Sequence, residues 1–231
     1  MARFKYLATR NFATPIRTPD GFMIESANEL ISYWSFFVER ECYQKEWGRP
    51  LQQAAAPVVL DVGANAGVFS HWIWTLNPRV NLVIFEPLPA MSAKIKNWIE
   101  VKQPRATLHA KAVSDEIGHA TFYASSGNDT GASLKGTTNH AQQFTVPLTT
   151  LDAVITEPDI LLAKIDVEGC EVQVLTGAAK TLMRTRHLLL EAHTMEALQA
   201  IQKLLPSEIW QCQKVGSSDY LFSRKTTNPS R

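Results

Sequence analysis

The chain has 231 residues, of which 45% are hydrophobic and 19% are charged, and its formal net charge is +1. This composition excludes an intrinsically disordered chain and is typical of one sizeable globular domain. Lys and Arg are scattered without a run. This argues against nucleic acid as the partner, because a phosphate backbone is bound by a clustered basic face.

The sequence carries no signal for secretion or for a membrane. The N-terminal "MARFKYLATRNF" lacks a long apolar stretch, and no apolar run approaches the about 20 residues that a transmembrane helix needs. The three cysteines, Cys42, Cys170 and Cys212, are too few and too far apart for a disulfide framework or a CxxC metal site. We therefore expect a cytoplasmic protein with reduced thiols and no membrane partner.

Residues 1–50 are expected to form an N-terminal extension that caps the main domain, residues 51–231. The Pro-Asp-Gly of "TPDGF" is a turn signal between two short extended runs and predicts a hairpin. An amphipathic helix is predicted over about 29–47, because apolar residues recur there at helical spacing. These residues are Leu30, Trp34, Phe37 and Val38. The following "GRPLQQAAAP" is typical of a linker.

From residue 57 onward, apolar runs alternate with amphipathic stretches. Strands are predicted over 57–63, 81–87, 106–115, 119–125, 160–169, 187–193, 209–215 and 220–225. Helices are predicted over 66–76, 89–101, 170–183 and 194–205. An extended run begins at 144, and the polar, Gly-rich residues 125–143 predict a long loop of the kind that serves as a lid. The alternation predicts an α/β fold with a mostly parallel sheet, helices on both faces and a closing hairpin at one edge.

Acidic residues follow the predicted strands. Ligands of open α/β sheets bind beyond the carboxyl ends of the strands, so these positions mark the candidate site. They are Asp61, Glu86, Asp115, Asp166 and Glu191. The first of them opens a glycine-rich turn, "DVGANAG" at 61–67, of the kind that holds a nucleotide.

Three classes of nucleotide site compete for this turn. A Walker-type phosphate loop needs Lys after its last glycine, where Val68 stands. A dinucleotide site needs a bare second glycine, where Asn65 would keep a pyrophosphate from the backbone, so a nicotinamide oxidoreductase is disfavoured. S-adenosylmethionine carries no phosphate, and Asp61 can meet its ammonium group directly or through water. We expect its methionine end to be wrapped by Gly63, Ala64, Asn65 and Gly67.

Two further positions match the rest of this cofactor. Glu86 ends the second strand and is followed by Pro87; an acid there hydrogen-bonds ribose hydroxyls, in NAD and S-adenosylmethionine alike. After the third strand, Ser114 and Asp115 of "AVSD" are expected to contact the adenine edge.

Several stretches together resemble the FkbM family of S-adenosylmethionine-dependent methyltransferases. They are "LDVGANAGVFS", "IFEPLP", "HAKAVSD", "TLDAV", "AKIDVEGCEVQVLTGA" and "LLLEAH". The resemblance implies a Rossmann-like class I methyltransferase fold, in which six strands of a seven-stranded sheet are parallel and the last is antiparallel. It also implies methyl transfer, typically to a hydroxyl oxygen of a sugar or natural-product scaffold and in some relatives to nitrogen, including peptide amides. The expected cofactor-binding residues are Asp61, Gly63, Ala64, Asn65, Gly67, Phe69, Glu86, Pro87, Ser114, Asp115 and Asp166.

A second polar group lies on two core strands. Lys164, Asp166 and Glu168 share one side of a strand by its period of two. A buried Lys needs a partner, for which Asp166 and Glu191 are the natural choices. His193 ends the next strand and is the expected general base, oriented by Glu168 or Glu191. The candidate catalytic residues are His193, Glu168, Lys164 and Glu191.

Alternatives stay open for the metal, the acceptor and the assembly. We expect no metal, but Asp166, Glu168 and Glu191, with His193 beside them, could supply ligands for Mg²⁺. We expect O-methylation of a small or glycosylated metabolite in natural-product biosynthesis. N-methylation of a peptide or amide and an inactive cofactor-binding module are the alternatives. The acceptor, a small molecule or peptide, is expected to be selected by the N-terminal helix and the 125–143 loop, in a monomer or homodimer.

Overall fold

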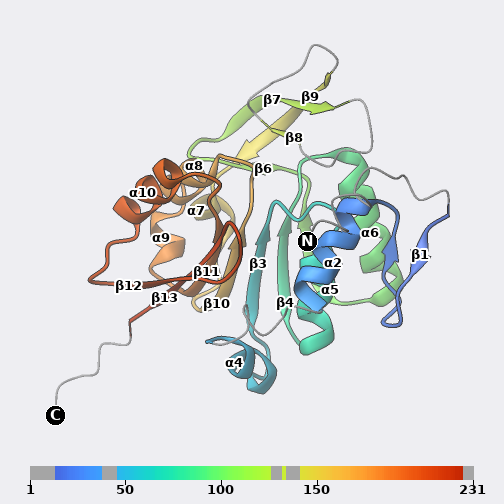
Figure 1. Ribbon diagram of the computed structural model, residues 1–231, viewed down its shortest axis with the longest axis horizontal. Helices are drawn as coiled ribbons and strands as arrows, with labels where there is room; N and C mark the ends of the chain where they lie inside the picture. The colour runs from blue at the N-terminus through green and yellow to red at the C-terminus, as the bar shows by residue number, and fades with distance from the viewer. Residues whose placement is uncertain (1–13, 38–45, 126–131, 134–140, 226–231) are drawn as a thin grey trace.

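The computed structural model describes residues 14–37, 46–125, 132–133 and 141–225, and its centre is a seven-stranded sheet (Figure 1). The strands lie side by side in the order β12-β13-β11-β10-β3-β4-β5. Their bounds are β3 Val58–Val62, β4 Asn81–Phe85, β5 Arg105–His109, β10 Ile160–Ile165, β11 Thr185–Glu191, β12 Trp210–Lys214 and β13 Asp219–Arg224.

The pairing of these strands confirms the predicted topology. Strands β5, β4, β3, β10 and β11 are parallel to one another. The last strand, β13, is antiparallel to both of its neighbours, β11 and β12, so six strands share one direction and β13 opposes them. The closing hairpin predicted from the sequence is therefore β12-β13. It forms one edge of the sheet, with β13 lying between β12 and β11.

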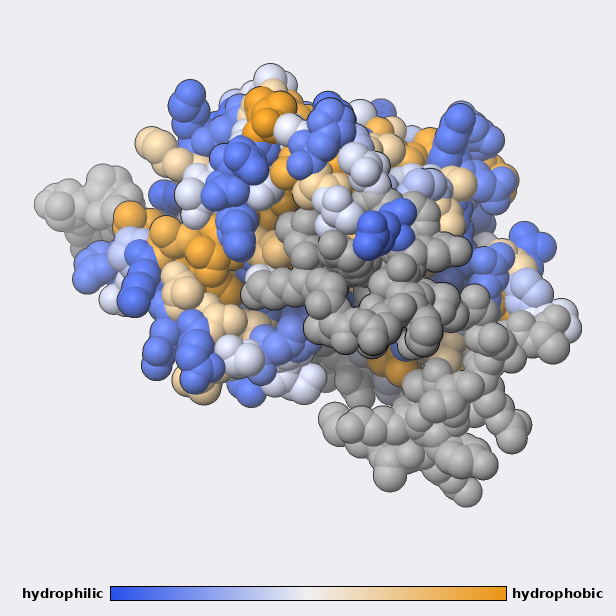
Figure 2. All heavy atoms as spheres, turned by 90° about the horizontal axis from the view of Figure 1, so that it is seen from above, coloured by the Kyte–Doolittle hydropathy of each residue, from blue (hydrophilic) through white to orange (hydrophobic). Residues whose placement is uncertain are grey.

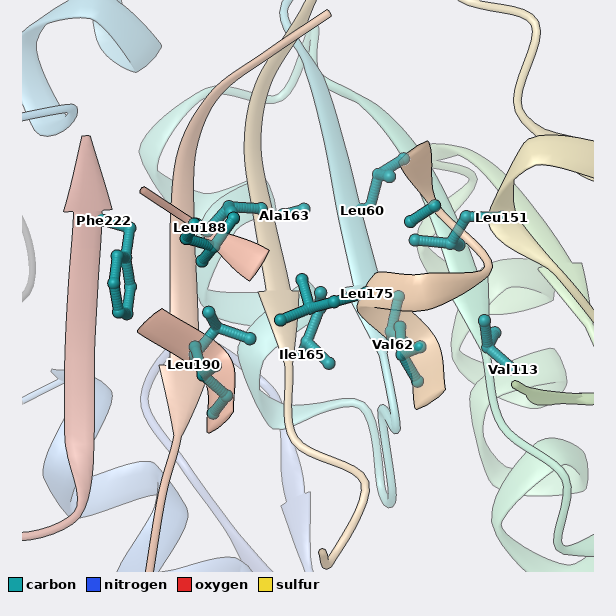
Figure 3. Packing of buried hydrophobic residues seen from close by; sticks show 14 of the residues in the cluster. Leu60, Val62, Val113, Leu151, Ala163, Ile165, Leu175, Leu188, Leu190 and Phe222 are labelled. Carbon is teal, nitrogen blue, oxygen red and sulfur yellow. The ribbon is translucent and has the colours of Figure 1, made fainter. Parts of the chain in front are cut away.

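Helices cover both faces of the sheet, as predicted. One face packs against α4 (Gly48–Gln53), α5 (Val68–Leu76) and α6 (Pro89–Lys102), and the other against α7 (Leu151–Val154), α8 (Glu171–Thr176), α9 (Ala179–Leu182) and α10 (Met195–Leu204). Successive strand residues point to opposite faces, so Val59 joins the first layer. Leu60 and Val62 join the second layer, which Figure 3 shows. Because both faces are buried, the strands are continuous apolar runs.

Two predicted elements are divided in the structure. The single helix expected over 170–183 is two short helices, α8 and α9, separated at Gly177. Gly177 packs so closely that a Cβ atom there would lie 2.2 Å from the carbonyl oxygen of Ser114, so tertiary contact interrupts the helix. The strand expected over 106–115 is β5 followed by β6 (Ala112–Val113), which pairs in another sheet.

That second sheet has four strands, in the order β6-β9-β7-β8, and stands over the carboxyl ends of the core strands (Figure 1). It adds β7 (Gly118–Ser125), β8 (Ala132–Ser133) and β9 (Ala141–Thr149). The predicted loop 125–143 therefore contributes residues to all three strands. The rest of that predicted loop, 126–131 and 134–140, lies outside the described residues.

The N-terminal segment contains the predicted hairpin, β1 (Ile16–Arg17) and β2 (Met23–Ile24), and then α2 (Ala27–Phe37). Helix α2 begins earlier than predicted because Ser26 caps it: the Glu29 amide donates to Ser26 Oγ at 3.3 Å. Trp34, expected on the buried face, is 40% exposed, and residues 38–45 lie outside the described part.

The predicted linker "GRPLQQAAAP" is wrong for its first six residues, which form α4. Pro50 falls in the first turn, where a helix tolerates proline. Leu51, one turn after the start, is fully buried together with Trp47 in the core beside α5. Burial of these two side chains outweighs the weak helix propensity of the segment.

Within the described ranges, no helix is long and apolar enough to cross a lipid bilayer. Figure 2 looks down on the molecule from the side of the second sheet and shows both hydrophilic and hydrophobic side chains on the described part of this face.

Candidate active site

The glycine-rich turn follows β3 and contacts the carboxyl ends of its two neighbouring strands, β4 and β10. Its Gly63 and Ala64 amides donate to the Phe85 carbonyl oxygen, at 3.0 and 3.1 Å, which ties the turn to β4. A Cβ atom on Gly63 would lie 1.9 Å from the Asp166 carbonyl oxygen, so only glycine lets the turn approach the end of β10. Gly63, Asn65 and Gly67 have positive φ angles of 77°, 52° and 81°.

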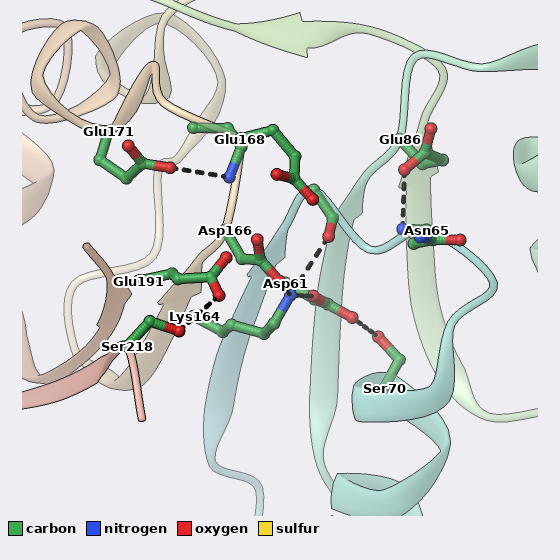
Figure 4. Close-up of polar contacts among 12 residues, drawn as sticks. Asp61, Asn65, Ser70, Glu86, Lys164, Asp166, Glu168, Glu171, Glu191 and Ser218 are labelled. Atoms are coloured by element: carbon green, nitrogen blue, oxygen red, sulfur yellow. Dashed lines mark hydrogen bonds and ion pairs between the residues drawn. The ribbon is translucent and has the colours of Figure 1, made fainter. Parts of the chain in front are cut away.

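An ion cluster lies behind this turn (Figure 4). Lys164 is directly opposite Asp61 in the register of β10 and β3. Its Nζ atom lies 3.0 Å from Asp166 Oδ2 and 3.8 Å from Asp61 Oδ1, and it donates to the Gly63 carbonyl oxygen at 3.2 Å. Burial alone would lower the pKa of Lys164, but the carboxylates of Asp166 and Asp61 raise it, so Lys164 stays charged. The predicted partner Asp166 is confirmed, and Asp61 is the partner that strand order alone could not reveal.

Asp61 lies beneath the turn and is fully buried. Its Oδ2 atom accepts from Ser70 Oγ at 2.6 Å, and burial raises its pKa. Its Oδ1 atom has no hydrogen-bond partner in the described part of the chain, and the same is true of Asn65 Oδ1. Buried acceptors without a donor are rare. Asp61 Oδ1 faces Lys164 Nζ at 3.8 Å and is not part of the cavity lining, so Asn65, which lines the cavity, is the residue whose free acceptor fits a ligand that brings a donor to the turn.

Glu86, which directly follows β4, lines the site beside the turn. One carboxylate oxygen accepts from the Asn65 amide at 2.7 Å (Figure 4). The other accepts from the Leu88 amide at 2.8 Å. The side chain is 4% exposed, and burial raises its pKa to about 7. Each oxygen keeps a lone pair for a further donor, as the predicted ribose contact requires.

A cavity opens beside Glu86 and brings together five of the eleven predicted cofactor residues, namely Gly63, Asn65, Glu86, Pro87 and Asp166. Its polar side chains are those of Asn65, Glu86, Lys111, Asp166 and Glu168, and the lining also includes Gly63, Pro87, Val167 and Cys170. Apolar side chains line it as well, from Phe85, Leu88, Ala112, Val113 and Phe122. Phe122 comes from β7, so it reaches the cavity only because the second sheet folds over the core.

Six of the predicted residues are not among the lining residues: Asp61, Ala64, Gly67, Phe69, Ser114 and Asp115. Ser114 and Asp115 bond to each other, with 2.9 Å between Ser114 Oγ and Asp115 Oδ1. Ala64 is 5% exposed within the turn. Phe69 is 2% exposed in the core, where its ring centroid lies 5.9 Å from Lys164 Nζ, so it covers the ion cluster. The adenine contact of Ser114 and Asp115 stays a prediction.

The candidate catalytic residues meet where β10 and β11 end. His193 Nε2 lies 3.2 Å from Glu191 Oε2 and 3.7 Å from Glu168 Oε2. The side chain of His193 is 53% exposed, so it can reach a bound acceptor. Glu191 Oε1 accepts from Ser218 Oγ at 2.8 Å, a contact from the β12-β13 turn that the sequence does not signal.

Glu191 and Asp166 form a carboxyl pair that shares a hydrogen bond. Burial and the neighbouring Asp166 carboxylate raise the pKa of Glu191 to about 8. Burial would also raise the pKa of Asp166, but Lys164 lowers it below the usual range. Asp166 therefore carries the negative charge near neutral pH, and Glu191 holds the proton between them.

The strand-period argument is wrong for Glu168. Strand β10 ends at Ile165, and Glu168 lies in a turn with a φ angle of 53°. This turn is held by the buried Glu171, whose Oε1 atom accepts from the amides of Val167 and Gly169 at 3.2 and 3.1 Å. Glu168 reaches His193 through the turn rather than along the strand face.

Carboxylate and imidazole atoms here are close enough to be considered as metal ligands. One ligand atom each from Glu168, Glu191 and His193 lies within 4.8 Å of the others. The Mg²⁺ ligands considered from the sequence also included Asp166, but in the structure the Asp166 carboxylate pairs with Lys164. Dependence on Mg²⁺ is tested by chelation with EDTA and addition of Mg²⁺.

The fold and this site together define a class I S-adenosylmethionine-dependent methyltransferase. The family model described as "Methyltransferase FkbM domain" matches residues 61–214, and the chain belongs to the FkbM methyltransferase family. The matched residues contain both the glycine-rich turn and the cluster around His193.

Named relatives agree with this assignment. The 2-O-methyltransferase NoeI of Sinorhizobium fredii is 30% identical over 175 residues, covering 65% of this chain and 72% of that protein. The 31-O-demethyl-FK506 methyltransferase FkbM of Streptomyces tacrolimicus is 26% identical over 227 residues, covering 82% and 86%. The methyltransferase domain of METTL16 has a TM-score of 0.51 and covers 96% of this chain and 91% of that domain. With 10% identity, it shows the shared fold alone.

The affinity for S-adenosylhomocysteine is expected to depend on pH through Glu86. Only the ionised carboxylate accepts from ribose hydroxyls while it also accepts from two backbone amides. Because the pKa of Glu86 in the free protein is about 7, affinity should level off above this pH and weaken below it, by up to about tenfold per pH unit. Calorimetric titrations across this range test the expectation, and Glu86→Gln should bind more weakly and lose this part of the pH dependence. A wild-type profile that matches that of Glu86→Gln contradicts the assignment.

Proposed function

We propose that this methyltransferase transfers the methyl group to a hydroxyl oxygen of a small or glycosylated metabolite. The printed names of the two relatives above, "2-O-methyltransferase" and "31-O-demethyl-FK506 methyltransferase", support this reaction. The observation that carries it is His193, which lies half-exposed beside Glu191 and Glu168 at the strand ends next to the cofactor cavity. A neutral hydroxyl is a poor nucleophile, and a base at this place would remove its proton.

The residues of the cavity fit the cofactor, which supplies an electrophilic methyl group on a sulfonium. Asp166 lines the cavity and carries the charge that would meet the ammonium group, while Asp61 lies behind the turn. The unpaired Asn65 Oδ1 atom is a further acceptor for the methionine end. Glu86 would take the ribose hydroxyls, and the apolar lining around Leu88 and Phe122 would enclose the base.

Lys164 acts behind this surface rather than on the acceptor. It is 7% exposed, and its amine is occupied by Asp61, Asp166 and the Gly63 carbonyl. We therefore assign Lys164 to holding the turn and to keeping Asp166 ionised. In the proton transfer, His193 takes the proton of the acceptor hydroxyl, and the neighbouring Glu168 carboxylate stabilises the imidazolium that forms.

The test has two stages. Binding of S-adenosylhomocysteine and of NADH is first compared by calorimetry, and only the former should bind. The protein is then incubated with methyl-labelled S-adenosylmethionine and a panel of glycosides, polyol macrolides and peptide amides, with and without EDTA. Label on oxygen supports the proposal, whereas label on nitrogen favours the amide alternative. Cofactor binding without transfer favours an inactive module, and loss of activity with EDTA that Mg²⁺ restores establishes a metal.

A further inference from the structure

We propose that the N-terminal hairpin holds the cofactor turn in place and that Asp20 attaches this hairpin to α5 through His71. Asp20 and His71 are then positioning residues for cofactor binding. The inference rests on the proposed cofactor site and adds a role for residues 14–37, which lie in front of the matched family domain. Asp20 lies in the β1-β2 turn, and His71 lies in the first turns of α5, the helix that begins where the cofactor turn ends.

The fastening is a buried chain of hydrogen bonds. The indole Nε1 of Trp98, which can only donate, donates to His71 Nδ1 at 3.0 Å. This places the imidazole proton on Nε2, which contacts Asp20 Oδ2. The second oxygen of Asp20 accepts from the Tyr33 hydroxyl of α2 at 2.5 Å. His71 is fully buried, so loss of Asp20 would leave its N–H group without a partner and weaken the attachment of the hairpin.

Apolar contacts carry this attachment to the turn itself. Phe22 and Ile24 of the hairpin form one buried cluster with Ala66 and Val68. Ala66 lies between Asn65 and Gly67, the two residues with positive φ angles that shape the end of the turn. The amide of Asn65 is also the donor that holds Glu86. A hairpin that detaches would free the turn to move and would disturb the ribose-binding acid with it.

A second anchor holds the same segment from the other side. Lys94 of α6 pairs with Glu29, at 2.7 Å, and with Glu25, at 3.1 Å. Glu29 is 4% exposed and also accepts from the Glu25 amide at 2.8 Å. The segment is thus fixed to both α5 and α6, beside which Figure 1 shows α2. None of its described residues is among those that line the cavity.

The test compares Asp20→Ala with Asn77→Ala. Asn77 is also buried and lies at the far end of α5, where its Nδ2 atom donates to the Leu51 and Ala54 carbonyl oxygens at 2.7 and 3.0 Å and fastens α4. Both variants should lower the melting temperature. At a temperature where both are folded, Asp20→Ala should raise the Kd for S-adenosylhomocysteine about tenfold, and Asn77→Ala should leave it unchanged.

Asp20→Asn keeps an acceptor for His71 and should restore most of the affinity. Once an acceptor is identified, Asp20→Ala should raise KM for the cofactor and leave kcat and KM for the acceptor at the wild-type values. Equal affinities of the wild type and Asp20→Ala overturn the inference, as does an equal loss in Asn77→Ala. Failure of the wild type to bind S-adenosylhomocysteine contradicts the proposed function instead.

Discussion

Gly63→Ala is expected to abolish measurable binding of S-adenosylhomocysteine and to destabilise the protein by roughly 3 kcal/mol or more. The added Cβ atom would lie 1.9 Å from the carbonyl oxygen of Asp166 and 2.9 Å from its carbonyl carbon. Both are backbone atoms that cannot rotate away, and the φ angle of 77° adds strain for any side chain. Calorimetric titration and thermal unfolding measure the two effects.

Two other glycines separate the causes of this effect. Gly169 has a φ angle of 96° with no atom within 4 Å of an added Cβ, so Gly169→Ala reports the strain alone. Gly118 has open space and no positive φ angle, so Gly118→Ala should be neutral or slightly stabilising. Wild-type affinity in Gly63→Ala would mean that the cofactor does not bind at this turn.

His193→Ala is expected to lower kcat by about 10²- to 10⁴-fold, the usual contribution of a positioned general base. The Kd for S-adenosylhomocysteine should not change, because His193 is not among the residues that line the cofactor cavity. The rate is measured with the acceptor found in the labelled panel, and the affinity is measured by calorimetry on the same preparation.

His187→Ala is the matched control. His187 is on the same strand, β11, but near its start, where its Nδ1 atom lies 2.9 Å from Ser223 Oγ. This variant should keep the wild-type kcat. If His193→Ala turns over near the wild-type rate, the base must be another group, and Glu168, which lines the cavity, becomes the next candidate.

Local sequence patterns anticipated the elements that pack on both faces of the sheet. Apolar runs such as "VVLDV" and "ILLAKI" are typical of parallel strands that are buried on both faces. Polar residues follow these runs because ligands of such sheets bind at the carboxyl ends of the strands. The family match, covering 61–214, confirms the class of enzyme that these strand ends indicated. The individual roles of the site residues stay predictions.

Elements shaped by distant contacts were the ones that local patterns missed. Gly177 divides a helix because it touches Ser114, and β6 leaves the line of β5 because β9 pairs with it. The linker prediction was wrong for residues 48–53, which form α4. Burial of Leu51 in the core stabilises a helix in this segment, although its Gly and Pro give it a weak helix propensity. Each result depends on a partner far away in the chain.

The sequence by itself determined the alternation of strands and helices, the glycine turn and the row of acids, because these follow from local periodicity and side-chain chemistry. Only the tertiary structure decided which charges meet. Lys164 and the Gly63 carbonyl are 101 positions apart, and Asp20 and His71 are 51 apart. The pairing of β10 with β3 and the docking of the hairpin on α5 bring these groups together in a buried environment, where unpaired charge is costly. Strand register and burial are properties of the whole fold, so they set the ionisation of Asp166 and the position of the cofactor turn.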